Sequence, residues 1–483
     1  MKTKYILFLG LAAAIASCTK DFEEFNTDIK NPSTVSGQSL FSNAEITLSD
    51  QVSSTNVNLN VFKLFAQYWT ETTYTDEANY DIINRGVPDL TFRQYYRGFL
   101  RDFQEADSLI MKTSPQNDAQ RVEQTNMHAI IEMLVCYSYQ NLVDIFGNVP
   151  YTEAMNINKI SPKYDDAATI YQDLIRRVDA AVTSIDTTQG SFGTADLIYG
   201  GNTGKWRKFG NSLKVRLGIT LSDVNPALAK STVESAVASG VFTSNSDNAL
   251  FRYLTAIHTN PIYQDVIQSG RNDFVPANTI VDLMNARQDP RRPFYFTMNN
   301  GVYVGGAYGE SSPYSQYSHI ADRISNPDFP GILLTYDEIL FYLSEAASRG
   351  FNVGGTAASY YNAAITNSIL FWGGTAADAA TYLARPDVAF TGPGTWQQKI
   401  GIQSYIAFYG RGLEGFNQWR RLDYPVLNIP PAIQNYSDIP KRYTYPVNEQ
   451  TLNKTNYESA SQAIGGDLLT TRVFWDVRDP VAP

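Results

Sequence analysis

Amphipathic helical spacing runs through most of this chain and is the feature that most restricts its fold. In the segment 166–182 apolar side chains recur every three or four residues, at Ile170, Tyr171, Leu174, Ile175, Val178 and Val182. That spacing places them on one face of a helix, and Asp165 just before it is the predicted N-cap. Similar stretches predict helices over 92–110, 122–145, 205–221, 228–239, 336–348, 357–371 and 396–409. The sequence therefore predicts a mostly α-helical fold.

Several of the predicted helices follow one another as antiparallel pairs. In one pair Ala346 and Ala347 are expected to face Ala363 and Ala364. Pairs that can bury their apolar faces only against the next pair form a stack similar to tetratricopeptide repeats. Between residues 241 and 330 the periodicity fades, and Asn, Gly, Pro and Tyr become frequent. Long irregular segments within compact proteins are usually functional, so we expect this loop-rich insertion to carry a functional surface.

The first eighteen residues have the layout of a bacterial lipoprotein signal. Lys2 and Lys4 precede an apolar run over residues 6–15, which is too short to span a bilayer. Small residues stand directly before Cys18, as the bacterial lipoprotein signal peptidase requires. We expect residues 1–17 to be removed and Cys18 to be lipidated, since several alkyl chains at about 0.8 kcal/mol per methylene give stable anchoring. The alternative is an ordinary secreted protein whose cleavage site happens to contain a cysteine.

The rest of the chain is acidic and has no second apolar run long enough to cross a membrane. Residues 18–36 are polar, and we interpret them as a tether to a single domain over 37–483. Loss of the two signal-peptide lysines changes the formal charge from −10 to −12, which argues against nucleic-acid binding. Cys136 is the only other cysteine, so no intrachain disulfide is expected, and its apolar helical context predicts a buried structural thiol.

The chain lacks the common sequence signatures of catalysis. His128, His258 and His319 are far apart, and none has a metal-binding spacing such as HExxH. There is no Gly-x-Ser-x-Gly motif, and paired acids such as Asp337 and Glu338 fall near helix starts, where the helix dipole favours negative charge. We therefore predict no catalytic residue, cofactor or metal ligand. A surface hydrolase whose two carboxylates meet only in space stays open as the alternative.

Four sequence features, taken together and in order, resemble the SusD/RagB family over essentially the whole mature chain. They are the lipoprotein signal, the run Tyr139–Pro150, the blocks Leu197–Gly201 and Lys205–Leu217, and the run Leu334–Gly350. The resemblance implies a mostly α-helical scaffold of tetratricopeptide-like helix pairs, with irregular insertions that form the ligand face. It also implies a non-enzymatic lipoprotein on the outer-membrane surface of Bacteroidetes. Such a protein captures oligosaccharides or oligopeptides and acts as the lid of a SusC-like TonB-dependent barrel transporter.

The same motifs also have a physical interpretation as scaffold. Gly147 can adopt the positive φ of a helix end, and Pro150 disfavours helix at the residue before it. Trp206, Phe209 and Leu213 recur on one helical face, which usually packs into a core. We therefore expect the ligand site to lie elsewhere.

The first predicted ligand-binding segment contains Trp69, Tyr74, Asn79 and Tyr80. It follows an apolar helical run that ends near Phe65, so these side chains are expected at a helix end and in the loop beyond it. Ligand-contacting aromatics of SusD relatives often come from this region. The alternative is that Trp69 caps the core while the nearby acids Asp76 and Glu77 are merely solvated.

The second predicted segment is the glycine-rich run 301–309, which contains Tyr303 and Tyr308. Glycines allow unusual backbone angles and would present Tyr rings beside bare amides. The alternative is a hairpin packed on the scaffold. A glycan would lie on aromatic faces, whereas a peptide would add main-chain hydrogen bonds. Because no loop carries a row of Trp, the sequence slightly favours an oligopeptide ligand but leaves both classes open.

Overall fold

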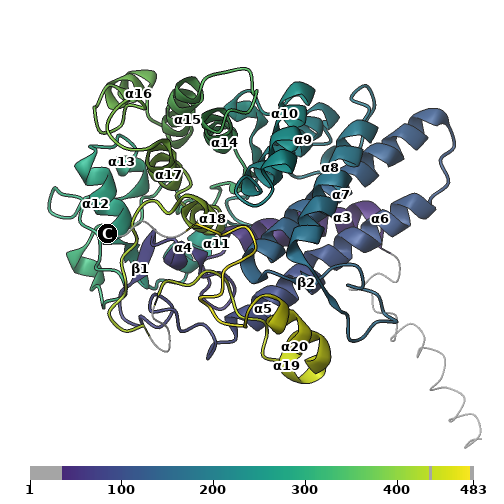
Figure 1. Ribbon diagram of the computed structural model, residues 1–483, viewed down its shortest axis with the longest axis horizontal. Coiled ribbons are helices and arrows are strands. Elements are labelled where there is room, and N and C mark those ends of the chain that lie inside the picture. Colours follow the sequence, from purple (N-terminus) through teal and green to yellow (C-terminus); the bar gives the residue numbers. More distant parts are fainter. Residues whose placement is uncertain (1–34, 434–437, 479–483) are drawn as a thin grey trace, which may run out of the picture.

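The computed structural model describes residues 35–433 and 438–478, most of them in helices or in the loops between them (Figure 1). The signal peptide, Cys18 and nearly all of the predicted tether lie outside these residues. The longer helices are α3 (Gly37–Ser53), α6 (Arg101–Lys112), α7 (Asp118–Phe146), α8 (Ala167–Ser184), α9 (Thr203–Thr220), α10 (Pro226–Ser239), α14 (Tyr336–Ser348), α15 (Ala357–Trp372), α17 (Trp396–Ala407) and α18 (Gly412–Leu422). Shorter helices are α4 (Phe62–Phe65), α5 (Val87–Arg93), α11 (Pro261–Tyr263), α12 (Asn278–Ala286), α13 (Arg292–Tyr295), α16 (Ala376–Leu383), α19 (Glu449–Leu452) and α20 (Lys454–Ala463).

Successive helices pack against one another largely in chain order. α7 packs on α6 and α8, α8 on α9, and α9 on α10. The stack continues through α14, which contacts α9, α15 and α17. Figure 1 shows α7, α8, α9 and α10 as a row of neighbouring helices. The mostly α-helical architecture of stacked helix pairs that the sequence predicts is confirmed.

Helix α8 shows how closely the sequence pattern defined one helix, and where it missed. The apolar face predicted over 166–182 is buried, but the N-cap is Asp166, whose carboxylate accepts a hydrogen bond from Thr169 N at 2.8 Å. The predicted cap, Asp165, is wrong. It lies in β3, and its carboxylate instead accepts from the backbone N–H groups of Tyr151 and Thr152.

Helix α7 ends as its sequence predicts. Gly147 has a φ of 83°, and its N–H donates to the Val143 carbonyl at 2.8 Å. The next side chain, Asn148, accepts a hydrogen bond from Ala167 N and so ties this helix end to the start of α8. Cys136 within α7 is buried, and burial raises the pKa of its thiol to about 12, which confirms the buried structural thiol.

The predicted pair α14 and α15 exists, but its alanines do not face each other. Ser344 Oγ donates to the Ala357 carbonyl at 2.8 Å, which places the end of α14 beside the start of α15. Ala346 lies in the main cluster of buried side chains, whereas Ala364 lies in a smaller second cluster. The expected alanine seam is therefore wrong, because the turn sets a different register from the one that small-residue matching suggests.

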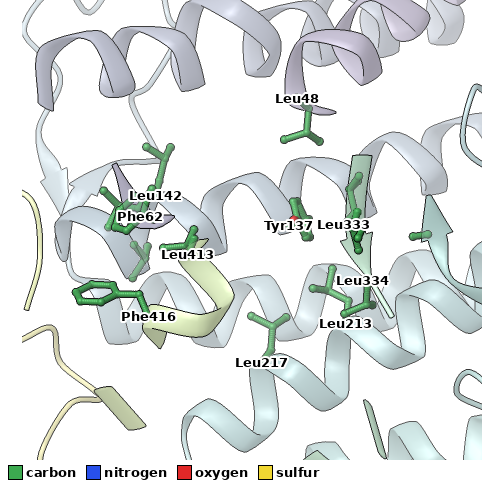
Figure 2. Close-up of a cluster of buried hydrophobic side chains, with 14 of the residues drawn as sticks. Leu48, Phe62, Tyr137, Leu142, Leu213, Leu217, Leu333, Leu334, Leu413 and Phe416 are labelled. Carbon is green, nitrogen blue, oxygen red and sulfur yellow. The ribbon is translucent and has the colours of Figure 1, made fainter. Parts of the chain in front are cut away.

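Side chains from distant parts of the sequence meet in the main core (Figure 2). Leu142 of α7, Leu213 and Leu217 of α9, and Phe416 of α18 are all fully buried. They share this cluster with Leu334, which precedes α14. Burial of side chains of this size contributes about 1.5–3 kcal/mol each. The Lys205–Leu217 motif is thus part of the scaffold, as its helical spacing predicts.

A buried group of charges joins two of the sequence motifs. Arg216 of α9 donates from Nε to Glu338 Oε1 at 2.7 Å and from Nη2 to Oε2 at 3.0 Å. Arg411, just before α18, forms an ion pair with the same carboxylate of α14. All three side chains are less than one-tenth exposed. Residues more than 120 positions apart therefore hold α9, α14 and the start of α18 together from inside.

Three short antiparallel strand pairs occur among the described residues. They are β1 (Trp69–Glu71) with β5 (Phe274–Pro276), β2 (Val149–Pro150) with β3 (Tyr164–Asp165), and β4 (Ala249–Phe251) with β6 (Gly331–Leu334). Residues 241–330 hold only short elements, including α11, a π-helical turn over Gln264–Gln268, α12 and α13. The β1–β5 pair joins this loop-rich segment to the chain that follows α4, and so brings two distant loops together.

Candidate ligand-binding site

A polar cavity of about 280 Å³ opens where the β1–β5 strand pair ends. One wall comes from residues 71–77, at the end of β1 and beyond it. The opposite wall comes from residues within 265–274, which lead into β5. Residues 55–58, after α3, and Arg85 complete the lining. The cavity therefore combines one of the two predicted ligand segments with part of the loop-rich insertion.

Tyr74 stands at this cavity with its ring open to solvent. Its side chain is 69% exposed, and it is the only Tyr, Phe or Trp among residues 35–433 and 438–478 that is largely exposed. A large aromatic face held in water carries a solvation cost, which a flat apolar ligand surface can relieve. Of the six predicted ligand-binding residues, Tyr74 alone both lines the cavity and presents an exposed ring.

Two buried carboxyls line the cavity beside this ring. Glu71 is 5% exposed and Glu77 is 1% exposed. Glu71 Oε2 accepts a hydrogen bond from Ala78 N at 2.9 Å, and Glu77 forms an ion pair with the guanidinium of Arg85. Burial, followed by the charge of Glu77, raises the pKa of Glu71 to about 9. At neutral pH Glu71 is therefore protonated, and the Glu77 carboxyl faces the guanidinium of Arg85.

The facing wall supplies further hydrogen-bonding groups. Thr55 Oγ1 donates to Asp265 at 2.7 Å, which fixes the loop after α3 against the insertion. Arg271 pairs with Asp273 at 2.8 Å, and both side chains keep more than a third of their surface in solvent. The cavity thus presents carboxylates, guanidinium groups, hydroxyls and amides within reach of one aromatic ring, which suits a polar, uncharged ligand with a flat apolar face.

Trp69 does not face a ligand. Its side chain is 1% exposed, and its indole Nε1 donates to the hydroxyl of Tyr409 at 2.9 Å. The ring also packs near Phe274, with ring centroids 5.7 Å apart. The expectation of an exposed Trp69 is wrong, because β1 pairs with β5 and Tyr409, in the chain after α17, bonds with the indole. The alternative, in which Trp69 belongs to the core, is correct.

Asn79 and Tyr80 are also buried and hold the loop in place. Asn79 Nδ2 donates to the Gly309 carbonyl at 2.8 Å, and its Oδ1 accepts from Ala432 N at 2.9 Å. Tyr80 is fully buried, and its hydroxyl accepts a hydrogen bond from Gln67. Their predicted ligand contacts are contradicted by this burial. They instead position the loop that carries Tyr74.

The glycine-rich run 301–309 packs on the scaffold rather than around the cavity. Tyr308 is 4% exposed, and its hydroxyl donates to the Leu64 carbonyl at 2.8 Å. Gly305 lies so close to Asn278 that an added Cβ would come within 2.6 Å of its backbone. Tyr303 is half-buried beneath the guanidinium of Arg292, at 5.3 Å, and does not line the cavity. The packed-hairpin alternative is therefore correct, and these glycines serve close packing.

Most of the residues that make up this cavity could not be predicted from the sequence. Glu77, which the alternative interpretation left solvated, is buried, and neither Arg85 nor Arg271 was singled out. The one available signal was the density of acids between positions 71 and 77. No local pattern indicated that residues near 265 would form the facing wall, since that contact depends on β1–β5 pairing.

Metal-binding groups of side chains and membrane-spanning helices are both absent from the described residues. Within residues 35–433 and 438–478, no group of three or more His, Cys, Asp or Glu side chains is arranged to hold a metal ion. Among the described helices, none is both long enough and apolar enough to cross a bilayer. All three histidines have hydrogen-bond partners, with His128 bonded to Asp107, His258 bonded to Asp50 and His319 bonded to the Tyr314 carbonyl.

A helical scaffold with a polar cavity edged by an aromatic ring is typical of helical binding proteins. Comparison with known proteins places the chain in one family of this class. A model of a SusD-like family described as "starch-binding associating with outer membrane" matches residues 29–446. The chain belongs to this SusD-like family, which confirms the resemblance seen in its motifs. A search of curated proteins finds no match.

Solved structures share the whole fold. A chitin-binding protein is 26% identical, with a TM-score of 0.80, over 92% of this chain and 100% of its own. A SusD homologue from Bacteroides uniformis is 25% identical, with a TM-score of 0.78, over 91% of this chain and 99% of its own. A Bacteroidetes SusD-like protein is 23% identical, with a TM-score of 0.79, over 92% and 100%, and this likeness concerns the fold alone.

Proposed function

We propose that this protein captures oligosaccharides at the outer-membrane surface, in the cavity beside Tyr74. The observation that carries the proposal is the single largely exposed aromatic ring of the described chain, placed at a polar cavity. A sugar ring has an apolar face that fits an aromatic side chain and hydroxyls that bond with carboxylates, guanidinium groups and amides. The cavity offers both kinds of contact together.

The chemistry of the cavity supports a neutral glycan more than a peptide. The side chains of its lining supply carboxylate, guanidinium, hydroxyl and amide groups, which suit the hydroxyls of a sugar. The related chitin-binding protein makes oligosaccharides of N-acetylated amino sugars the first candidates. The family description makes α-linked glucose oligosaccharides the second. Oligopeptide capture, which the sequence alone slightly favoured, becomes the competing outcome.

The protein acts in this proposal by binding and not by catalysis. The two buried carboxyls of the cavity are held by the protein itself, since Ala78 N donates to Glu71 and Arg85 pairs with Glu77. Carboxyls held in this way fit a structural role rather than the free acid and base that flank a glycosidic bond. Family relatives described as binding proteins support the same view.

We further propose that the captured glycan passes to a SusC-like TonB-dependent barrel, for which this protein is the surface lid. The lipoprotein signal that ends at Cys18 and the family's association with the outer membrane support this arrangement. Lipidation at Cys18 would hold the protein at the membrane while the tether lets the lid move.

Direct ligand binding tests the first part of the proposal. Isothermal titration calorimetry of the purified mature chain would compare chitin-derived, starch-derived and mixed-sequence peptide oligomers. Binding of one glycan class, with peptides inert, is the expected result. Binding of peptides alone would overturn glycan capture. Release of reducing sugar during the titration would support the alternative function, a surface hydrolase.

Native purification tests the second part. Membranes from cells that carry either the natural chain or a Cys18→Ser variant would be solubilised and analysed by mass spectrometry. A large outer-membrane barrel should accompany the natural chain, and the variant should leave the membrane fraction when the barrel is absent. Retention of the variant in barrel-free membranes would contradict the lipid anchor at Cys18.

A further inference from the structure

A row of arginines projects from one continuous helical segment on the face away from the core. α5, a π-helical turn over Gln94–Leu100 and α6 follow each other without a break. Arg93, Arg97 and Arg101 are four residues apart along this segment, and all three are exposed. None has a side-chain hydrogen bond or ion pair with the described residues. Asp89 and Glu105 lie four residues beyond the two ends of the row, so its positive charge is centred on Arg97.

An apolar hollow lies directly beside this row. It has a volume of about 320 Å³, and its lining includes Arg97 and Arg101 together with the acid Glu449. Its apolar walls include Tyr96 of the π-helical turn and Met155 and Pro162 from the loop between β2 and β3. π-helical turns are rare and often mark functional positions. The hollow thus links the arginine row to the β2–β3 loop.

The β2–β3 loop carries two isoleucines that are almost wholly exposed. Ile157 is 88% exposed and Ile160 is 93% exposed. The loop is nevertheless well anchored, because Lys163 N donates to Glu153 and Asn453 donates to the Pro162 carbonyl at 2.8 Å. Both isoleucines are therefore held out in water by a fixed backbone. Figure 1 shows β2, α5, α19 and α20 gathered at one edge of the molecule.

We propose that this edge docks onto a lipid surface that carries anionic headgroups. Arginines would contact the headgroup phosphates while Ile157 and Ile160 enter the acyl boundary, a combination typical of proteins that lie on membranes. The projecting isoleucines favour a lipid layer over a protein partner, because fluid lipid receives protruding side chains without needing matched pockets. The exposed arginines, rather than the net charge of the edge, favour anionic over neutral lipid.

The start of the described chain lies close enough for this contact. Gly37 packs against Ala106 and Ile110 of α6, the helix that begins at Arg101. Val35 lies seventeen positions after Cys18, and an extended chain spans about 3.3–3.6 Å per residue. A tether of that reach, with its lipid in the membrane, permits this edge to rest on the same membrane.

Vesicle binding tests the proposal on the mature chain from residue 18 with Cys18→Ser, which removes the lipid itself. Cosedimentation would use phosphatidylcholine vesicles with and without phosphatidylglycerol. Binding should require phosphatidylglycerol and weaken with salt. Because each arginine near an anionic surface contributes roughly a fivefold gain, Arg97→Gln with Arg101→Gln should lower partitioning about twentyfold. Ile157→Ser with Ile160→Ser should lower it as well.

Matched controls separate this surface from general effects of charge or apolar exposure. Arg207→Gln removes another exposed arginine, and Ile257→Ser removes an isoleucine that is 90% exposed on a different loop. Both should leave partitioning unchanged. Equal losses in the controls, or no preference for phosphatidylglycerol, would overturn the proposal. The proposal would also be overturned if the edge variants bound vesicles as before but lost a copurifying barrel, because the edge would then be a protein interface. Glycan binding at Tyr74 should be unaffected by every variant, so the two proposals fail separately.

Discussion

The indole Nε1 of Trp69 donates a hydrogen bond to the hydroxyl of Tyr409 at 2.9 Å, across 340 positions of sequence. This contact ties β1 to the chain after α17 and places the most conspicuous aromatic of the predicted ligand segment inside the core. The exposed ring of the same segment is Tyr74, five residues further on. The division of roles between these two residues can be tested directly.

Replacing Trp69 by Ala should destabilise the protein by about 3–5 kcal/mol, because a large buried side chain leaves a cavity. Trp69→Phe retains most of the ring and should cost less, chiefly the hydrogen bond to Tyr409, at about 1 kcal/mol. Urea unfolding monitored by circular dichroism measures both. If Trp69→Ala left stability unchanged but abolished glycan binding, Trp69 would be a ligand-binding residue and not a core residue.

Replacing Tyr74 by Ala should weaken glycan binding by about 1–2 kcal/mol, near tenfold or somewhat more, while the free energy of unfolding stays within about 0.5 kcal/mol. The ring is exposed, so its loss creates no internal cavity. Calorimetric titration and urea unfolding on the same preparation give both values. Tyr74→Phe, which keeps the flat face, should retain most of the affinity. Full affinity in Tyr74→Ala would place the glycan elsewhere.

Glu71 should make stability fall as pH rises. Its pKa is about 9 in the folded protein against an ordinary value of 4.5, so between these values the folded state holds a proton that the unfolded state has lost. Its contribution to stability is complete below pH 4.5 and is lost as pH rises towards 9. Glu71→Gln can still accept the bond from Ala78 N and removes this loss. The gain in melting temperature over the natural chain should therefore be larger at pH 8 than at pH 5.

A constant difference between the two proteins across this pH range would contradict a protonated Glu71. Glu105→Gln, at an exposed carboxylate on α6, provides the matched control and should show no such trend. Measuring the difference between variant and natural chain cancels the titration of other buried groups, such as Lys63, whose pKa burial lowers to about 7.

Replacing Glu338 by Gln should cost about 3–5 kcal/mol of stability, because Arg216 and Arg411 would keep their buried charges without the carboxylate that offsets them. Chemical denaturation measures the loss, again with Glu105→Gln as the exposed counterpart. Glycan binding by the folded fraction should persist, because this network lies outside the cavity lining. A neutral effect on stability would mean that the charges are less buried than their contacts indicate.

The helical scaffold could be predicted because its information is local. The apolar spacing of α8 and the helix stop at Gly147 depend on residues within one or two turns, so periodicity and a single glycine were enough. The predicted N-cap of α8, Asp165, was wrong by one residue. Either of two adjacent aspartates can cap a helix, and because β2–β3 pairing places Asp165 in β3, Asp166 is the cap.

The ligand cavity could not be predicted in the same way. Whether an aromatic residue is buried depends on what packs over it, and for Trp69 and Tyr308 the partners lie hundreds of residues away. The sequence alone determined the family motifs and most of the helices, and it predicts the lipoprotein signal, because each is encoded in neighbouring residues. Only the tertiary structure decided that Tyr74 is exposed beside Glu71 and Arg85, because long-range strand pairing assembles that wall.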